Sequence, residues 1–391
     1  MQSDQTSSHS YTPRSLIVKQ NTTSLEEIRF EDIDRGNLLG KGSFGTVFKA
    51  VWHHPNKGPR EVAIKYFETE IEKAEFNIER KQLARVNHPN IIQMYGVCQY
   101  PFVLLVMEFA ECGSLYKILH QSKPAPEYNA GHAVSWCIQC AKGVNYLHNL
   151  KPKPLIHRDL KSPNLLLVNH GLTLKICDFG TACDKSTIMT NNKGSAAWMA
   201  PEVFEGSTYS EKCDVFSWGI ILWEVLARRL PFQEIGGNDL RVLWAIHTDQ
   251  RPPKIKGCPP TLETIMTSCW DKDINIRPSM EEVVSSMSYL AKFFPGSQEP
   301  IRFLYSGKQL FRPTITFVIF SDEDAEGERV GSESLVSYDT AEQSLVSQSE
   351  VAVRHKADSL SVSGDNPEWL ALAVNTSSFN QPNKQPLDIT A

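Results

Sequence analysis

The chain has 391 residues, of which 41% are hydrophobic and 22% charged, as in an ordinary soluble globular protein. Its formal net charge of −5 gives no sign of a nucleic-acid partner, and none is expected. Residues 321–391 hold 13 acidic and 4 basic residues, so the first 320 residues carry a net charge of about +4. We therefore expect a mildly basic body followed by an acidic tail.

The nine cysteines and the short apolar segments narrow the class of protein. The odd cysteine count and a start without basic or apolar regions predict reduced thiols in a cytoplasmic protein. Cys137 and Cys140 have the spacing of half a zinc site, but no second pair follows, which favours a buried structural pair. The longest apolar stretch, Val215 to Val225, is far shorter than the roughly 20 residues of a membrane span.

In chain order, the amino-acid composition first changes near residue 33. Residues 1–32 are rich in Ser, Thr, Gln and Asn and are predicted to form a flexible leader. Short β-branched runs then predict strands, and one amphipathic stretch predicts a helix. The predicted strands lie at 45–51, 60–65 and 102–107, and the predicted helix lies at 70–85.

From residue 111 the periodicity is helical. Long periodic runs predict helices at 133–150, 211–229 and 279–293. We predict an α+β fold over residues 33–295, with a β-rich N-lobe to about 110 and a helical C-lobe from 111 to 295. Residues 296–391 are predicted to be a largely disordered tail, in which 301–320 has the composition of a strand docked on the body.

The first motif is Gly40-Lys-Gly42-Ser-Phe-Gly45, followed by the strand-favouring Thr46-Val47. In dinucleotide-binding folds the last glycine of such a motif opens a helix, whereas here it opens a strand. A glycine-rich hairpin lets backbone N–H groups approach phosphates that a Cβ would hold away. Taken alone, the motif supports a nucleotide-binding hairpin and a plain β-turn about equally.

The second motif is Val62-Ala-Ile-Lys65 in an apolar run. A lysine in such a strand is usually a solvated edge charge, but Glu72, Glu75 and Glu79 of the following helix offer it a partner. We choose Glu79, because Leu83 follows one helical turn later on the same face. This pair would hold the lysine head against the α- and β-phosphates of a nucleotide.

The third signal is a set of three motifs in fixed order. They are His157-Arg-Asp-Leu-Lys-Ser-Pro-Asn164, Asp178-Phe-Gly180 and Ala200-Pro-Glu202. Asp159 is predicted to orient or accept the proton of an attacking hydroxyl, and Lys161 to offset charge on the transferred phosphoryl group. Asn164 and Asp178 are predicted to bind Mg²⁺ through oxygen atoms. The alternative, a set of structural turn carboxylates, is much less favoured because it does not explain the spacing.

Together these motifs resemble the eukaryotic protein kinases over residues 33–295. The resemblance implies a five-stranded N-lobe, a helical C-lobe and ATP between them. It also implies a hinge at Glu108-Phe-Ala110, a Glu202–Arg277 pair and an anchoring role for Asp214. The residues that the resemblance assigns to ATP are Leu39, Gly40, Gly42, Gly45, Val47, Ala63, Lys65, Met107, Glu108, Ala110 and Leu166.

Finer features resemble one branch of that family. Lys161 and the segment Gly194-Ser195 are typical of serine/threonine kinases. Runs such as 175–184 and 189–206 resemble the transforming-growth-factor-β-activated group of MAP kinase kinase kinases. That resemblance implies MAP kinase kinases as substrates, in stress or innate-immune signalling.

Two departures limit the resemblance. The loop Trp52–Arg60 is longer than the usual short link, and no coiled coil follows the domain, so adaptor partners are not carried over. The alternative function is a catalytically weak scaffold that competes with a longer paralogue. The complete set of motifs argues against this alternative, because a pseudokinase usually lacks at least one of them.

Five hydroxyl residues lie between Gly180 and Ala200, and these are Thr181, Ser186, Thr187, Thr190 and Ser195. A solvated loop has the same composition, but Arg158 and Lys193 are cations placed to receive a phosphate. The resemblance points to Thr187, Thr190 and Ser195 as positions that the kinase phosphorylates on itself.

Ser195 and Cys177 each have a competing interpretation. The Ser195 hydroxyl is also a candidate contact of Asp159 and Lys161, where it would shape the acceptor site. Cys177 immediately precedes Asp178. It is interpreted either as a small core residue, which is favoured, or as a thiol that faces the nucleotide.

Overall fold

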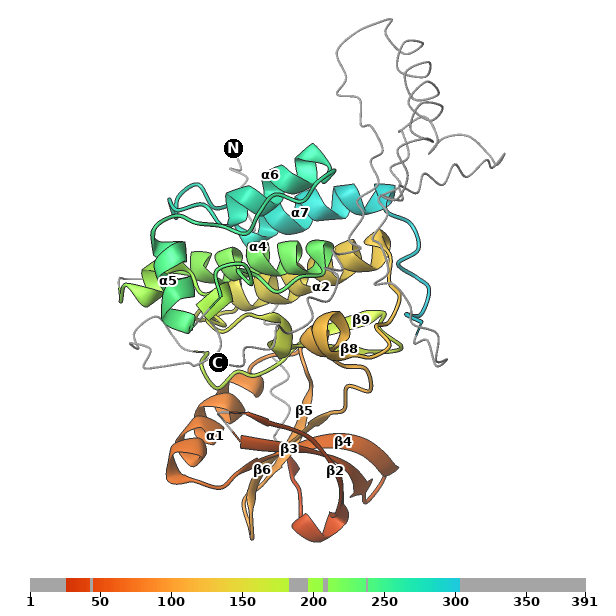
Figure 1. The fold of residues 1–391 in the computed structure, drawn as a ribbon. Coiled ribbons are helices and arrows are strands. Elements are labelled where there is room, and N and C mark those ends of the chain that lie inside the picture. The colour runs from red at the N-terminus through yellow and green to blue at the C-terminus, as the bar shows by residue number, and fades with distance from the viewer. Residues whose placement is uncertain (1–25, 43–44, 183–195, 207–209, 237, 303–391) are drawn as a thin grey trace, which may run out of the picture.

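The computed structural model describes residues 26–42, 45–182, 196–206, 210–236 and 238–302, which form two lobes (Figure 1). The smaller lobe consists of a sheet and one long helix, and the larger lobe is mainly helical. The predicted two-lobed α+β fold is therefore confirmed. Over these residues, no helix combines the length and the apolar character that a membrane crossing requires.

The N-lobe sheet has six strands in the order β1-β5-β6-β4-β3-β2. Strands β2 to β6 are antiparallel to their neighbours, and β1 adds a sixth strand parallel to β5, with Glu26 opposite Gly96. The sheet is thus one strand wider than the resemblance implied. The strands are β1 (Glu26–Glu27), β2 (Ile33–Gly42), β3 (Gly45–His54), β4 (Gly58–Phe67), β5 (Met94–Cys98) and β6 (Val103–Glu108).

Both faces of this sheet are buried. Side chains alternate between the faces of a strand, so Leu104 and Leu105 of β6 join different cores. Helix α1 (Glu70–Leu83) packs on the inner face. The outer face is covered by the segment that precedes β2, where Ile28 is buried.

Helix α1 starts at a capping box. The Thr69 hydroxyl accepts a hydrogen bond from the Glu72 backbone N–H (3.2 Å), and the Glu72 carboxylate accepts one from the Thr69 N–H (2.9 Å). Phe76, Glu79 and Leu83 are buried at spacings of one helical face. Glu79 therefore points toward the sheet and not toward solvent.

The C-lobe is organised around α4 (Lys212–Ala227), which is buried at every position from Cys213 to its end. Helix α2 (Ala130–His148) packs against α4, α7 and β9. The other elements are β7 (Gly113–Ser114), η2 (Lys117–Gln121), η3 (Ser162–Asn164), β8 (Leu165–Val168), β9 (Thr173–Ile176), η4 (Ala196–Trp198), α3 (Pro201–Phe204), α5 (Asp239–His247), α6 (Pro260–Cys269), α7 (Met280–Leu290) and η5 (Ala291–Phe293).

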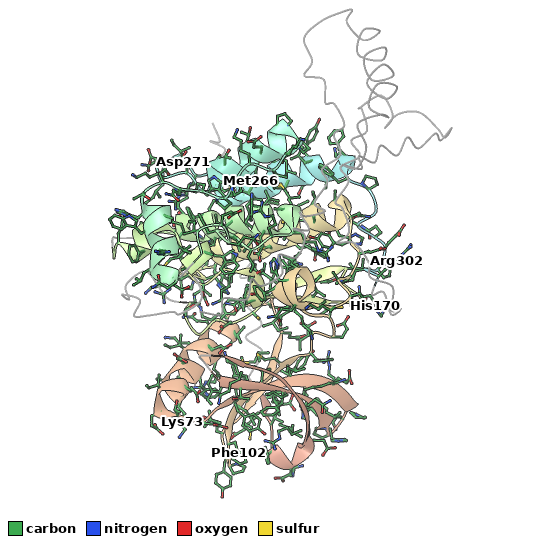
Figure 2. The ribbon with its side chains drawn as sticks, in the orientation of Figure 1. Lys73, Phe102, His170, Met266, Asp271 and Arg302 are labelled. Carbon is green, nitrogen blue, oxygen red and sulfur yellow. The ribbon has the colours of Figure 1, made fainter. Side chains whose placement is uncertain are left out.

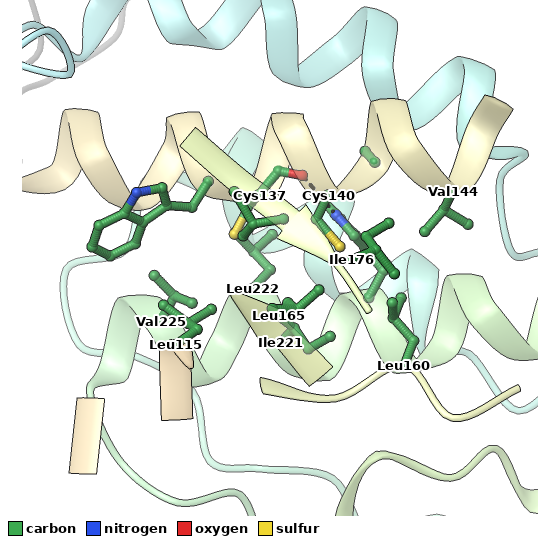
Figure 3. Close-up of a cluster of buried hydrophobic side chains, with 14 of the residues drawn as sticks. Leu115, Cys137, Cys140, Val144, Leu160, Leu165, Ile176, Ile221, Leu222 and Val225 are labelled. Carbon is green, nitrogen blue, oxygen red and sulfur yellow. Dashed lines mark hydrogen bonds between the residues drawn. The ribbon is translucent and has the colours of Figure 1, made fainter. Parts of the chain in front are cut away.

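The core of the C-lobe lies between α2, α4 and the β8–β9 hairpin (Figure 3). Cys137 and Cys140 of α2 point into this core, near Leu165 and Ile176 of the hairpin and Ile221 of α4. Both cysteines are buried, as expected for a structural pair, and burial raises the pKa of each thiol.

The β8–β9 turn is covered by residues 296–302, a segment that returns after α7. The Ile301 N–H donates to the His170 carbonyl (3.1 Å), and the Ile301 side chain packs over Gly171. Gly171 has φ of +84°, and a Cβ there would lie 2.6 Å from Ile301. Figure 2 shows His170 and Arg302 side by side at this edge of the lobe.

The domain bounds at residues 33 and 295 remain predictions from the sequence. Residues 26–32 and 296–302 pack on the domain from both ends of the described chain. The rest of the predicted leader and tail, including most of the strand-like segment at 301–320, lies outside the described residues.

The segment predicted as a long loop, Trp52 to Arg60, is instead an extended hairpin. Strands β3 and β4 stay paired out to His54 opposite Gly58, with Trp52 opposite Arg60. Only the three residues 55–57 form the turn. The extra length is therefore ordered sheet.

Candidate active site

The first part of the site is a three-residue charge cluster that joins the lobes. The Lys65 Nζ lies 2.7 Å from Glu79 Oε2 and 3.3 Å from Asp178 Oδ1. Burial opposes the charge of Lys65, but the two carboxylates outweigh it and raise the lysine pKa above its usual value. Burial also opposes the charge of Asp178, yet Lys65 holds the pKa of that carboxyl below its usual value. Of the three glutamates that the sequence offered, Glu79 is the partner.

The second part is the catalytic loop around Asp159, whose side chain is 2% exposed. The Lys161 Nζ lies 2.7 Å from Asp159 Oδ2, and the Asn164 Nδ2 donates to the same oxygen (3.0 Å) and to the Asp159 carbonyl (2.9 Å). A cation and an amide thus fix one carboxylate oxygen. The three predicted residues of this loop are together, although their roles stay predictions.

Asp214 of α4 holds the backbone that precedes Asp159. Its carboxylate accepts hydrogen bonds from the N–H groups of His157 (2.9 Å) and Arg158 (2.8 Å) and lies 2.8 Å from His148 Nε2. Arg158 has φ of +67°, a left-handed conformation that costs a residue with a side chain about 1–3 kcal/mol. Burial works against the Asp214 charge, but His148 outweighs it and lowers the carboxyl pKa. Asp214 therefore stabilises a strained catalytic loop.

The glycines of the first motif differ in whether the fold leaves room for a side chain at their position. Gly45 has φ of +127°, and a Cβ there would lie 2.3 Å from the Tyr66 carbonyl, so the fold itself requires glycine. A Cβ at Gly40 would meet no atom within 4 Å. The fold does not require glycine there, and the open space fits a loop that approaches phosphates. Gly42 pairs with Gly45 at the turn of this hairpin.

The residues assigned to the base lie on adjacent strands. Val47 is opposite Gly40 and Lys65, and Ala63 is opposite Met107. Leu166 lies on β8 and packs, with Met107, in the main core, whereas Leu39 on β2 is half exposed. The hinge residue Glu108 ends β6 and Ala110 follows it.

The donor atoms fit a divalent metal bound with a nucleotide. Asp178 supplies a carboxylate, and within the described chain the Asn164 Oδ1 receives no hydrogen bond. The Cys177 N–H donates to the Asn164 carbonyl (3.0 Å). The β8–β9 hairpin therefore fixes the distance between the two donor residues, Asn164 and Asp178. Mg²⁺ in phosphoryl-transfer sites is held by one or two such oxygens and by the phosphates. Asn164 and Asp178 are therefore the residues that would hold it.

The segment between Gly180 and Ala200 is only partly described. Thr187, Thr190 and Ser195 all lie outside the described residues, as does Lys193. The Arg158 Nε donates to the Thr181 carbonyl (2.6 Å) at the start of this segment. The predicted phosphate receiver is therefore already in contact with the segment that it would order.

The sequence analysis missed the role of Glu224 on α4, which is fully buried. Its carboxylate accepts hydrogen bonds from Ser162 Oγ (2.6 Å) and Trp198 Nε1 (2.9 Å) and lies 2.8 Å from His120 Nε2. It thus ties together the catalytic loop, η4 and η2. A signal was present, because a carboxylate inside an apolar helix must find polar partners.

The two-lobed fold, the Lys65–Glu79 pair across the sheet and α1, and the loop around Asp159 define a protein kinase. A family model described as protein tyrosine and serine/threonine kinase matches residues 33–287, and the chain belongs to this family. Membership implies ATP and a divalent metal as cofactors.

The relatives narrow the resemblance to MAP kinase kinase kinases. Mitogen-activated protein kinase kinase kinase 7 of Bos taurus is 59% identical over 280 residues, which is 72% of this chain and 47% of the relative. The Homo sapiens protein of the same name is 59% identical over 280 residues, 72% of this chain and 45% of its own length. The Drosophila melanogaster protein of the same name is 48% identical over 295 residues, which is 74% of this chain and 42% of the relative. The chain spans less than half the length of these relatives.

Proposed function

We propose that this chain is a serine/threonine protein kinase that transfers the γ-phosphoryl group of ATP to a hydroxyl of another protein. The observation that carries the proposal is the 3.3 Å contact between Lys65 of the N-lobe and Asp178 of the C-lobe. It brings the predicted phosphate-binding lysine and the predicted metal ligand to one place between the lobes. The roles below rest on this geometry together with family membership.

The residues divide the reaction between them. Asp159 accepts a hydrogen bond from the attacking hydroxyl and takes its proton, while the new O–P bond forms and the bond from the γ-phosphorus to ADP breaks. Lys161, beside Asp159, offsets charge on the transferred group. Lys65, fixed by Glu79, positions the α- and β-phosphates. When bound at Asn164 and Asp178, Mg²⁺ neutralises charge on the phosphates.

Substrate and place in the cell are proposed from the relatives. The matched proteins are named as MAP kinase kinase kinases, which supports MAP kinase kinases as substrates in stress or innate-immune signalling. We propose a cytoplasmic enzyme, regulated by phosphorylation of Thr187, Thr190 and Ser195. Phosphopeptide mapping of the active protein tests the last point, because a fully active chain without phosphate at these positions would contradict it.

The test of the catalytic proposal is Asp159→Asn, with ATP turnover measured on a kinase-dead MAP kinase kinase. We expect turnover to fall about 10²–10⁴-fold, while ATP affinity changes little because the lost contact is to the acceptor hydroxyl. Asp34→Asn is the matched control, since Asp34 is an exposed N-lobe carboxylate, 75% exposed, and should leave turnover unchanged. A parent protein no more active than Asp159→Asn would support the scaffold alternative, which the comparisons do not favour.

A further inference from the structure

The extended β3–β4 hairpin forms one wall of a cavity of about 460 Å³ on the N-lobe. Glu26 of β1 and Tyr95 of β5 also line the cavity. The volume falls within the roughly 300–1,000 Å³ of ordinary ligand sites. The outer end of the hairpin, residues 52–60, is the segment in which this chain departs from the usual short link, and it contains none of the residues of the catalytic site.

The floor of the cavity is aromatic. The ring of Trp52 lies 4.8 Å from the ring of His54 and 6.2 Å from that of Tyr95, nearly parallel to the latter at 27°. Trp52 itself is buried, so only part of its ring faces the cavity. Trp52 and Tyr95 stack on each other, and the Arg60 guanidinium covers the Tyr95 ring, so another ring can meet this floor edge-to-face.

The rim of the cavity is positively charged. The Arg60 guanidinium lies over the Tyr95 ring at 4.1 Å, and Lys57 stands at the turn of the hairpin. Among the residues that the structure describes, no carboxylate is within ion-pair distance of Arg60 or Lys57. The lining carboxylate, Glu26, is instead 3.8 Å from His54. A guanidinium stacked on a ring keeps its N–H edge for an anion.

An aromatic floor with a cationic rim fits a peptide in which an aromatic residue follows an acidic one. The chain carries such a peptide at Asp365-Asn-Pro-Glu368-Trp369, within an acidic region, and Trp369 is the one tryptophan after residue 302. A random coil of 62 residues, the number that separates Arg302 from Asp365 in the sequence, has an end-to-end distance of about 45 Å. A domain of this size has a radius of gyration of about 18 Å, so the peptide can reach any part of its surface.

We propose that this cavity binds the chain's own segment 365–369, with Trp369 on the Trp52–Tyr95 floor and the two carboxylates at Arg60 and Lys57. The site also has a connection to the hinge. The Gln93 N–H at the cavity wall donates to the Glu108 carboxylate (3.2 Å), and the Glu108 N–H donates to the Gln93 carbonyl (2.8 Å). Any effect on ATP binding rests on the proposed function, whereas occupancy of the cavity does not.

The experiment is zero-length cross-linking of the full 391-residue chain with a carbodiimide at high dilution, followed by peptide mapping of the monomer. A short-range amide between the Lys57 amine and Asp365 or Glu368 is expected. A tethered segment has an effective concentration on the order of 1 mM, so even weak binding of about 0.1 mM enriches the link about tenfold. Lys151, an exposed C-lobe lysine, gives the background rate of reaction with the same carboxylates.

Two variants make the test specific. Trp369→Ala should reduce the Lys57 cross-link to the Lys151 background, and Arg60→Met should reduce it several-fold. Phe379→Ala is the matched control, because Phe379 is a tail aromatic without an acidic neighbour and should change nothing. Equal yields at Lys57 and Lys151, or cross-links only between two copies of the chain, would overturn the proposal. Neither result depends on kinase activity, so it leaves the proposed function untouched.

Discussion

Each lobe contains a buried ion pair between a cation and a glutamate, Lys65–Glu79 in the N-lobe and Arg277–Glu202 in the C-lobe. The two pairs differ in their other hydrogen-bond partners. In the C-lobe, Arg277 donates two hydrogen bonds to the Glu202 carboxylate, at 2.7 and 3.0 Å, which confirms the predicted pair. Its other N–H groups donate to the carbonyls of Asp271 (2.8 Å) and Lys212 (3.1 Å). The guanidinium is therefore satisfied on every side by one fixed set of acceptors.

The N-lobe pair has no such fixed set. Lys65 donates a hydrogen bond of 2.7 Å to Glu79 and a longer one of 3.3 Å to Asp178. Glu79 comes from the N-lobe and Asp178 from the C-lobe, and Asp178 itself has φ of +65°. The comparison teaches that the Arg277 pair joins segments within the C-lobe, while the contacts of Lys65 join the two lobes at the site.

The largest effect on folding is expected for Arg277→Met. It leaves the Glu202 carboxylate buried without its partner, which should lower the free energy of unfolding by about 3–5 kcal/mol. Urea denaturation measures this loss. Arg229→Met is the control, because Arg229 pairs with Glu234 at the surface and such pairs contribute about 0–1 kcal/mol. Equal losses in the two variants would mean that the C-lobe pair is not structural.

Lys65→Met should affect activity more than folding. We expect phosphoryl transfer to fall about 10²-fold or more, because a positioned charge on the phosphates is lost. Burial raises the pKa of Glu79, so this carboxyl can bind a proton and limit the loss of stability to less than that of Arg277→Met. Turnover and urea denaturation are both measured, with Lys73→Met on the exposed face of α1 as the control. A stability loss as large as that of Arg277→Met would remove the distinction between the pairs.

Glu75 of α1 adds a pH dependence to the stability of the N-lobe. Burial, partly opposed by Lys65, raises its pKa from 4.5 to about 7. Because the unfolded chain releases this proton first, the free energy of unfolding should fall as the pH rises from about 4.5 to about 7. Glu75→Gln should remove part of that fall between pH 5 and pH 7.5, whereas Glu70→Gln, 89% exposed on the same helix, should not. An unchanged pH profile in Glu75→Gln would show that the carboxyl titrates normally.

The smallest effect is expected at Cys177, beside Asp178. Burial raises the pKa of this thiol, so little thiolate is present near pH 7 and alkylation should be slow. Mass spectrometry should show labelling that rises toward pH 9 and falls when ATP and Mg²⁺ are present. Cys98, buried on the outer face of the sheet, should show no effect of nucleotide. Equal labelling of Cys177 with and without nucleotide would favour the small core residue over the thiol that faces the nucleotide.

The sequence predicted best the features that depend on residues close together in the chain, such as the face of a helix and the presence of a strand. The helical period indicated which glutamate of α1 shares a face with Leu83, and the helix predicted at 70–85 begins where α1 begins. The three predicted strand runs fall on β3, β4 and β6, although β3 and β4 extend further than their runs and β6 begins one residue later than its run. Their ends depend on pairing partners that a single run does not contain.

The sequence could not predict contacts made over long separations. Glu224 meets Ser162 at a separation of 62 residues and His120 at 104, and no local pattern connects them. Ile28 was placed in the leader because its neighbours are polar, yet it is buried on the outer face of the sheet. The segment Trp52–Arg60 was interpreted as a long loop, yet only its centre forms a turn, because its two halves pair with each other.

The packing of Ile301 over Gly171 also has a consequence for folding during synthesis on the ribosome. Ile301 follows Gly171 by 130 positions, and a ribosome that adds about 5–20 residues per second needs about 7–26 s to reach it. Throughout that time the nascent hairpin between Asn164 and Asp178 has its turn exposed. The contact that covers the β8–β9 turn is therefore among the last contacts of the described chain to become possible during synthesis.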